Sequence, residues 1–193
     1  QQQVDIQWPT LANSDWPMIK HDPQFTGRSP YKGPQSATIV WIKDMPNGIF
    51  SGPVIGEKGN LYFGSYYVFG NDFYSYTADG NYIWHYETSG SRAPESGILI
   101  DSSQTIYFGS RDSCLYALNS DSTFKWEYET SAPITEMSIP NIDLQGNIYI
   151  TAANGELYSI KPYGTLNWKV TYENAFTFKS PVISPDGNTI YIA

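Results

Sequence analysis

Residues 21–30, with the sequence HDPQFTGRSP, hold the densest group of side chains that could do chemistry. His21 stands beside Asp22, and Thr26, Arg28 and Ser29 follow. A histidine oriented by an aspartate can activate a hydroxyl nucleophile, and an arginine with nearby hydroxyls can bind a phosphate. A catalytic pair of this kind normally comes from different strands or loops, however, because neighbours in sequence tend to point their side chains apart.

The surroundings of this group predict a connector instead. Prolines at 17, 23, 30 and 34, with glycines at 27 and 33, are typical of an extended, turn-rich segment. Asp22 before Pro23 suits the start of one turn, and Thr26 before Gly27 suits a second turn. We therefore predict that residues 1–36 form an extended leader and that the segment 21–30 is a structural strap.

The other reactive side chains are isolated in the sequence. Cys114 is the single cysteine, so an internal disulfide and a thiolate metal cluster are excluded, and its strand-like surroundings predict a buried, inert thiol. His21 and His85 are 64 positions apart and lack the spacing of metal ligands, and His85 should face away from Trp84. No GxSxG, P-loop or GxGxxG motif occurs. The sequence thus predicts no catalytic residue, no metal and no cofactor.

Composition narrows the partners and the fold class. The formal net charge is −8 and the sequence pI is about 4.6, which argues against nucleic acid or an anionic membrane surface as the partner. No run approaches the ~18 apolar residues of a membrane span. Aromatic residues make up 16% of the chain, including 16 Tyr and 6 Trp, and this favours strands over helices.

Internal repeats decide the predicted architecture. Four tryptophans recur in similar phrases at intervals of 43, 42 and 42 residues: Trp41, Trp84, Trp126 and Trp168. Phrases such as LYFGS and TIYFGS recur in register with them, and dividers such as EKGN and SPDGN have the chemistry of hairpin turns. Four short strands in ~42 residues match one blade of a β-propeller. We predict that the tryptophans are structural and clamp each blade to the next, with a cation-binding aromatic cage as the alternative.

The repeat predicts an all-β fold with about 3.5–4 blades, an incomplete propeller. After the leader, we expect an outer strand at 37–44, blades at about 49–88, 94–129 and 135–171, and a half blade at 177–193. Such a chain is either part of a longer protein with more blades, or a fragment that self-associates through its exposed blade edges. A closed four-blade ring is a further option, in which VDIQW at 4–8 supplies a missing strand.

The tryptophan phrases resemble the pyrroloquinoline-quinone-type propeller repeat. They read SYTADGNYIW at 75–84, ALNSDSTFKW at 117–126 and SIKPYGTLNW at 159–168, and the resemblance spans about 37–193. Enzymes of this family carry an adjacent cysteine pair over the quinone, and this chain has no such pair. The resemblance therefore implies the fold, a setting outside the cytoplasm (periplasm, cell surface or secreted) and the non-enzymatic branch, which includes outer-membrane assembly lipoproteins and surface propellers.

In a propeller, the loops from strand four to the next strand one and from strand two to strand three share one face, here called the loop face, where ligands usually bind. On the loop face we place Arg92, Arg111, Asp112, Asn154, Glu173 and Asn174. The blade-one loop is three residues longer than its equivalents and contains Tyr66, Tyr67 and Phe69. Exposed aromatics of this kind suit a carbohydrate, peptide or protein partner, or they cover the blade edge.

These observations favour a non-catalytic propeller that binds a protein or a glycan, or acts as a scaffold. The alternative is an enzyme of the propeller class, either a degenerate quinoprotein or a carbohydrate-active propeller whose catalytic residues lie on loops.

Overall fold

The computed structural model describes residues 8–33, 35–46, 48–49, 51–66, 72–89, 92–172 and 179–192. These residues contain strands and turns but no helix, and they form four antiparallel sheets. The described part therefore holds no helix that is long and apolar enough to span a membrane. The predicted all-β class is confirmed.

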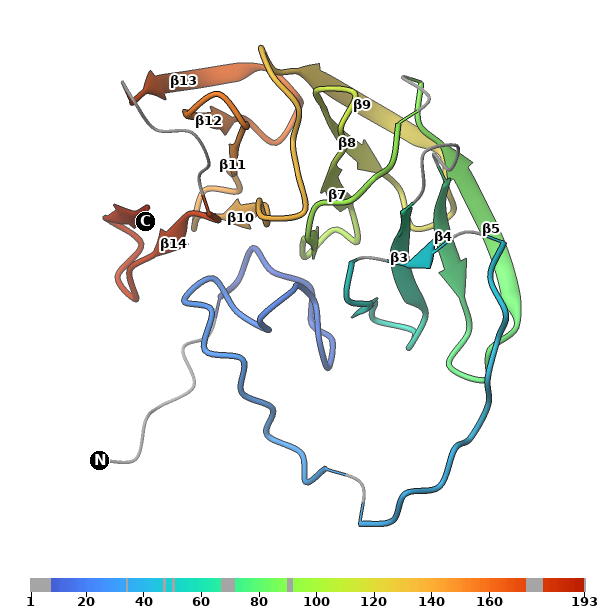
Figure 1. Cartoon of the computed structure of the whole chain (residues 1–193). Helices are drawn as coiled ribbons and strands as arrows, with labels where there is room; N and C mark the ends of the chain where they lie inside the picture. The colour runs from blue at the N-terminus through green and yellow to red at the C-terminus, as the bar shows by residue number, and fades with distance from the viewer. Residues whose placement is uncertain are drawn as a thin grey trace.

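Each full blade is a four-stranded antiparallel meander with a short innermost strand. Blade one contains β2 (Val54–Ile55), β3 (Leu61–Tyr66), β4 (Asp72–Tyr76) and β5 (Tyr82–Glu87), and a short β1 (Gly48–Ile49) also pairs with β3. Blade two contains β6 (Ile98–Ile100), β7 (Ile106–Gly109), β8 (Cys114–Leu118) and β9 (Phe124–Glu129). Blade three contains β10 (Asn141–Ile142), β11 (Ile148–Thr151), β12 (Glu156–Ile160) and β13 (Leu166–Thr171). A half blade contains β14 (Val182–Ile183) and β15 (Ile190–Tyr191). Figure 1 shows the blades side by side in an arc.

Burial follows the position of each strand in its blade. In blade two, β6 and β7 are buried throughout, whereas the outermost β9 alternates between exposed and half-buried side chains. The core therefore lies toward the inner strands and between neighbouring blades. Phe73 of blade one stacks on Phe108 of blade two with ring centroids 4.1 Å apart, which shows how directly adjacent sheets pack.

The segment 37–44 is not the strand that the sequence predicts. No strand is present among the described residues 35–46, and most of these side chains are exposed. A strand needs a neighbouring backbone to pair with, and no third strand of the same blade lies beside this segment in the described part of the chain. Its tryptophan is nonetheless placed as expected, since the Trp41 indole Nε1 donates to the Ala78 carbonyl at 2.8 Å.

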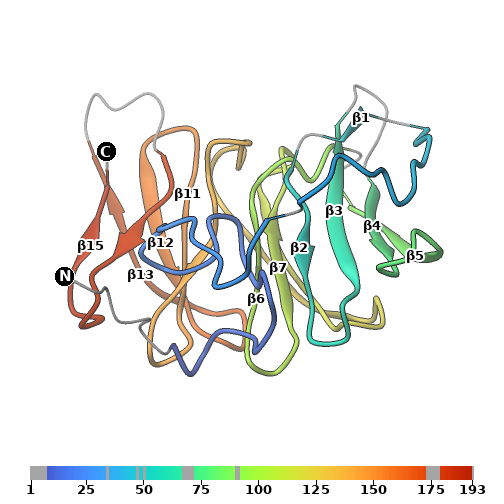
Figure 2. The same ribbon diagram turned by 90° about the horizontal axis from the view of Figure 1, so that it is seen from below.

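The leader runs across the inner strands of the blades. The Ala12 amide donates to the Ile100 carbonyl at 3.0 Å, and the Ile183 amide donates to the Pro23 carbonyl at 3.1 Å. Trp8, 7% exposed, donates its indole N–H to the Ile142 carbonyl at 2.9 Å. Figures 1 and 2 show this part of the leader crossing the centre of the arc from the half blade toward β2. Residues 8–25 are therefore an integral part of the fold, and Trp8, Ala12 and Met18 are buried in its core.

Candidate functional site

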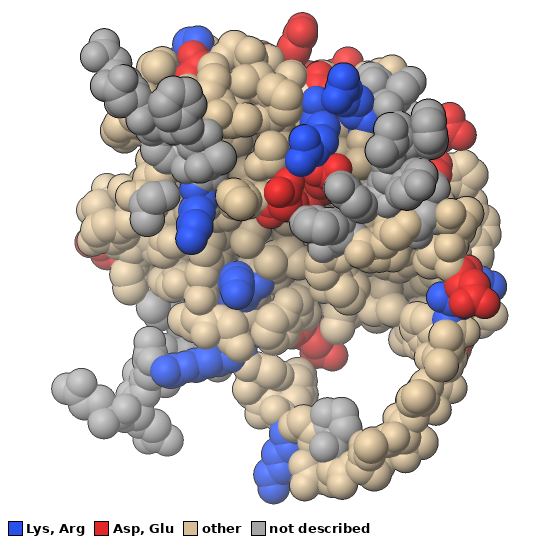
Figure 3. Space-filling model, in the orientation of Figure 1, with Lys and Arg blue, Asp and Glu red and all other residues tan. Residues whose placement is uncertain are grey.

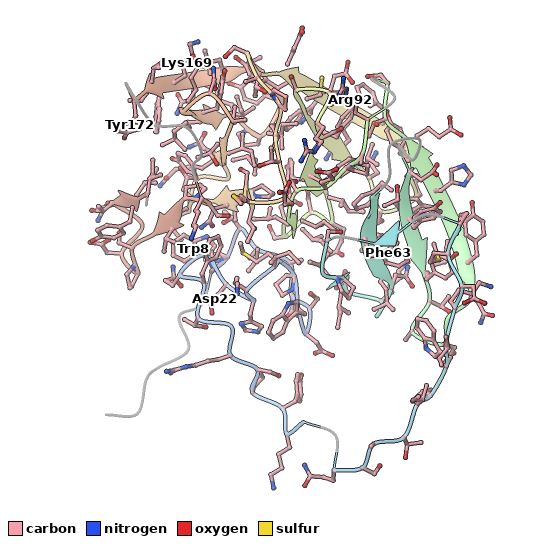
Figure 4. All side chains as sticks on the ribbon, in the orientation of Figure 1. Trp8, Asp22, Phe63, Arg92, Lys169 and Tyr172 are labelled. Atoms are coloured by element: carbon pink, nitrogen blue, oxygen red, sulfur yellow. The ribbon has the colours of Figure 1, made fainter. Side chains whose placement is uncertain are left out.

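The structure uses Asp22 to build a turn. Its carboxylate accepts hydrogen bonds from the Gln24 amide and the Thr26 amide, both at 3.1 Å, and from the Thr26 hydroxyl. His21 has a left-handed backbone with φ of 75°, and its Nδ1 lies 3.5 Å from the Asp22 carboxylate. Figure 4 shows Trp8 and Asp22 together on the leader, near the half blade. Asp22 is therefore committed to the turn rather than to activating a nucleophile.

His21 also lines a cavity of about 310 Å³ between the leader and blade one. The leader contributes polar groups to this cavity, and the turn between β2 and β3 closes it from the other side. The lining residues are Asn13, Ser14, Asp15, His21, Pro30 and Tyr31 from the leader, and Ile55, Gly56, Glu57 and Gly59 from blade one. We call it the leader cavity. Since it is lined by a turn between strands one and two, it lies at the opposite end of the blades from the loop face.

Blade one differs from blades two and three at the first residue of this turn. In blades two and three, the turn after strand one starts with Asp101 or Asp143, whose carboxylates accept the hydroxyls of Tyr107 at 2.8 Å and Tyr149 at 2.7 Å. Burial raises the pKa of both tyrosines, so the hydroxyls stay protonated and donate. Blade one has Gly56 at this position, and Gly56 has no side chain that could accept the hydroxyl of the cross-strand tyrosine, Tyr62.

Hydrogen bonds shape the polar lining of the leader cavity. The Tyr31 hydroxyl donates to the Asp15 carboxylate at 2.9 Å, and this bond raises the pKa of Tyr31. The Ser14 hydroxyl donates to the Ile55 carbonyl at 2.5 Å, which ties the leader to blade one. Two carboxylates, an imidazole, a carboxamide and a phenol hydroxyl therefore meet around one concave surface. Such groups can bind a ligand rich in hydroxyl groups.

On the loop face, Arg111 is held in an ion-pair cluster. Its guanidinium contacts the carboxylate of Glu95 through Nε, and its Nη2 lies 3.3 Å from the Glu136 carboxylate. The hydrogen bond to Glu95 raises the pKa of Arg111, whereas burial raises the pKa of Glu95. Figure 3 shows acidic and basic side chains close together on this side of the molecule. Arg111 thus has protein partners at the position where the sequence suggests a ligand contact.

The other predicted loop residues also contact neighbouring protein groups. Asp112 accepts the Tyr116 hydroxyl at 2.7 Å, and the Ser89 amide, from the preceding blade, donates to the same tyrosine oxygen at 3.2 Å. The backbone carbonyl of Arg92 accepts hydrogen bonds from the side chains of Thr88 and Ser110 at 2.8 and 3.0 Å. These contacts join blade one to blade two.

Blade three repeats this arrangement with Glu156. Its carboxylate accepts the Tyr158 hydroxyl, and the Ser131 amide donates to that hydroxyl oxygen at 2.9 Å. Asn154, predicted on the loop face, donates to Glu156 at 3.0 Å. Glu173 and Asn174 lie outside the described residues, as do Tyr67, Phe69 and the side chain of Tyr66.

The repeated tryptophans contact the following blade. Trp84 donates its indole N–H to the Ser120 carbonyl at 3.1 Å, and Trp126 donates to the Pro162 carbonyl at 3.0 Å. Each acceptor belongs to the turn between strands three and four of the next blade, as in the case of Trp41. Trp168 is 37% exposed and packs near Tyr149 of its own blade.

Cys114 is half-buried, and burial raises its thiol pKa to about 12, so the thiol stays protonated.

Solved structures with the same arrangement of blades are β-propellers of different activities. A quinohemoprotein alcohol dehydrogenase from Comamonas testosteroni matches with a TM-score of 0.63 and 20% identity, over 88% of this chain and 29% of that one. A virginiamycin B lyase from Staphylococcus aureus matches with a TM-score of 0.61 and 14% identity, over 76% and 49%. BamB from Moraxella catarrhalis matches with a TM-score of 0.58 and 16% identity, over 74% and 43%.

The chain has a β-propeller fold. The resemblance of its tryptophan phrases to the pyrroloquinoline-quinone-type repeat is confirmed at the level of the fold by these structures. The chain spans less than half the length of each of the three proteins described above. No known protein family and no curated protein matches its sequence.

Proposed function

We propose that this chain is a non-catalytic β-propeller module that acts outside the cytoplasm and binds a glycan in the leader cavity. The observation that carries the proposal is the cavity itself, whose volume of about 310 Å³ lies at the small end of the range for ligand sites. A site of this size suits a small glycan. The setting outside the cytoplasm rests on the resemblance of the repeat.

The chemistry of the lining suits a sugar. The carboxylates of Asp15 and Glu57 accept hydrogen bonds from hydroxyl groups, and the amide of Asn13 can both donate and accept. Tyr31 is 64% exposed, so its ring is free to pack against the apolar face of a sugar. The anionic lining disfavours a negatively charged ligand and favours a neutral or amino-bearing glycan.

Contacts on the loop face support the choice of the leader cavity. Arg111 is held there by two glutamates, and the Asp112 carboxylate accepts from the Tyr116 hydroxyl and the Cys114 amide. A ligand would have to replace these contacts before binding either residue. Tyr66, Tyr67 and Phe69 stay a proposed second contact surface, for a protein partner.

The proposal is tested with a glycan array, followed by calorimetry on the glycans that bind. Asp15→Asn removes a charge and keeps the shape of the side chain, and Tyr31→Phe removes the hydroxyl but keeps the ring. Each should weaken binding about tenfold, because each removes a hydrogen bond to the ligand or the bond that orients it. Asp79→Asn makes the same charge change in an exposed turn of blade one and should leave affinity unchanged.

Two outcomes would contradict the proposal. One is an array with no glycan bound above background. The other is a bound glycan whose affinity is the same for wild type, Asp15→Asn and Tyr31→Phe, since that ligand would lie elsewhere on the molecule.

A further inference from the structure

Blade one carries a histidine and two carboxylates on one face of its sheet. β4 and β5 pair Asp72 with Glu87 and Tyr74 with His85. Because side chains alternate along a strand and face their cross-strand partners, these four side chains share a face. One ligand-capable atom each of Asp72, His85 and Glu87 lies within 4.8 Å of the other two. Trp84 occupies the opposite face, toward blade two.

The same positions in blade three hold a positive charge. There the register pairs Glu156 with Thr171 and Tyr158 with Lys169. The Lys169 Nζ lies 2.8 Å from the Glu156 carboxylate, and the Thr171 hydroxyl donates to the same oxygen at 3.3 Å. In blade three, therefore, a cation lies beside the carboxylate at the start of strand three.

Blade one has no side chain at these positions that can take the place of this lysine. Histidine replaces Lys169, and Glu87 replaces Thr171, so the group contains two carboxylates around an imidazole. Carboxylate oxygens and an imidazole nitrogen are ligands for divalent first-row metal ions. A bound divalent cation would supply the positive charge that the lysine supplies in blade three.

Two tyrosines hold the potential ligands in place. The Tyr82 hydroxyl lies 2.8 Å from His85 Nδ1, while His85 Nε2 lies 3.7 Å from the Glu87 carboxylate. The Tyr74 hydroxyl donates to the Asp72 carboxylate at 3.0 Å. A hydrogen bond on one ring nitrogen that fixes the other toward the ion is the usual arrangement of a metal-binding histidine.

We propose that Asp72, His85 and Glu87 form a site for a divalent transition metal ion, Zn²⁺ in particular. Nε2 of His85 would provide the nitrogen ligand, and one oxygen from each carboxylate would complete a three-ligand set. The His85 and Glu87 side chains are 44% and 68% exposed, so the ion can enter from solvent and Glu87 can rotate to close the site. The remaining coordination position is open to water or to a donor from a partner.

The test is a calorimetric titration of the chelator-treated protein with zinc chloride. Wild type should bind one ion, and His85→Gln and Asp72→Asn should each weaken binding at least tenfold. Two controls should keep the wild-type affinity. His21→Gln removes the other histidine, and Glu129→Gln changes the residue that takes the place of Glu87 in blade two. Melting temperatures without zinc show whether each variant is folded.

Three outcomes of the zinc titration and its calcium counterpart would contradict the proposal. Unchanged zinc affinity in His85→Gln would overturn it, as would loss of binding in His21→Gln. Equally tight binding of calcium, unaffected by His85→Gln, would also overturn it, because a calcium site uses oxygen ligands and does not need the imidazole.

Discussion

At the scale of single residues, Glu156 is the most densely hydrogen-bonded carboxylate described. It is 6% exposed, and its two oxygens accept from a lysine, an asparagine, a serine, a threonine and a tyrosine: Lys169, Asn154, Ser131, Thr171 and Tyr158. The hydrogen bond from Lys169, with those from Ser131 and Tyr158, holds the pKa of Glu156 well below its ordinary value of 4.5. Ser131 comes from the preceding blade, so the carboxylate ties two blades together.

We expect Glu156→Gln to lower the free energy of unfolding by about 2 kcal/mol at pH 7, because the amide keeps only one acceptor oxygen, brings an NH2 group toward the remaining donors and removes the charge that pairs with Lys169. The lowered native pKa fixes the pH dependence. The charged carboxylate stabilises the fold fully above its ordinary pKa of 4.5, and the contribution is lost as pH falls through the native pKa. The difference between wild type and variant should therefore be constant from neutral pH to about 5 and shrink at lower pH. Urea unfolding across this range measures it.

Glu129→Gln is the control for this experiment, since Glu129 is an exposed glutamate on the outer strand of blade two. Glu129→Gln should change the free energy of unfolding by less than about 0.5 kcal/mol, both at neutral pH and below pH 5. A Glu156→Gln variant as stable as this control would show that the hydrogen bonds to Glu156 contribute nothing net.

The sequence does not reveal this group, although each member stands in a predictable place. Asn154, Glu156 and Tyr158 lie around the start of a predictable strand, but Ser131 and Lys169 approach from other segments. Their meeting depends on strand register and on the packing of blades, and neither can be derived from an acidic residue that occurs singly. The same holds for Asp72, His85 and Glu87, where the cross-strand register is the signal that would have found the cluster.

At the scale of elements, the repeated tryptophans Trp41, Trp84 and Trp126 pack against the turn between strands three and four of the next blade. A Cβ atom on Gly164 would lie 2.7 Å from the Trp126 ring, and Gly164 has a φ of +87°. Gly59 has a similar φ of +77°, but nothing lies within 4 Å of the position of its Cβ. Substituting each glycine therefore distinguishes the cost of backbone strain, which both positions share, from the cost of overlap with the ring, which occurs only at Gly164.

We expect Gly164→Ala to destabilise the protein by about 3 kcal/mol, from left-handed strain together with the overlap with Trp126. Gly59→Ala should cost about 1 kcal/mol, from strain alone. Thermal and urea unfolding of both variants give the comparison. Equal losses would mean that the ring moves aside freely and does not hold the turn.

Repeated strand phrases were predictable because each blade has the same local pattern of tyrosine, turn and tryptophan. The segment 37–44 has the phrase of an outer strand, TIVWIKDM, yet it forms no strand. A strand forms only where a neighbouring strand can pair with its backbone, and the local sequence pattern does not show whether that neighbour is present. The leader cavity was missed for a related reason, since its walls come from residues 13–31 and 55–59, two segments that only the tertiary fold brings together.

At the scale of the whole molecule, the leader joins blades that are distant in the chain. Met18 is fully buried and bridges to Leu99 of β6, and the Ile55 amide donates to the Trp16 carbonyl at 2.8 Å. The Trp8 indole N–H donates to the Ile142 carbonyl of the third blade, and the Pro23 carbonyl accepts from the Ile183 amide of the half blade. The leader should therefore fold and unfold together with the inner strands, and not as a separate tail.

Amide hydrogen exchange tests this cooperativity. The amides of Ala12 and Ile19 donate to β6, and the Ile100 amide of β6 donates to the leader at Pro17, so all three should exchange at similar slow rates. Met18→Ala removes a buried side chain at a cost of about 2–4 kcal/mol, and it should lower the protection of the three amides together. If the leader opened independently of the blades, these three amides would exchange rapidly, because all three take part in leader–β6 hydrogen bonds, while the amides between β7 and β8 stayed protected. That outcome would contradict the cooperativity. Protection of Ile100 alone would contradict the fold itself, because the Ile100 amide has its acceptor in the leader.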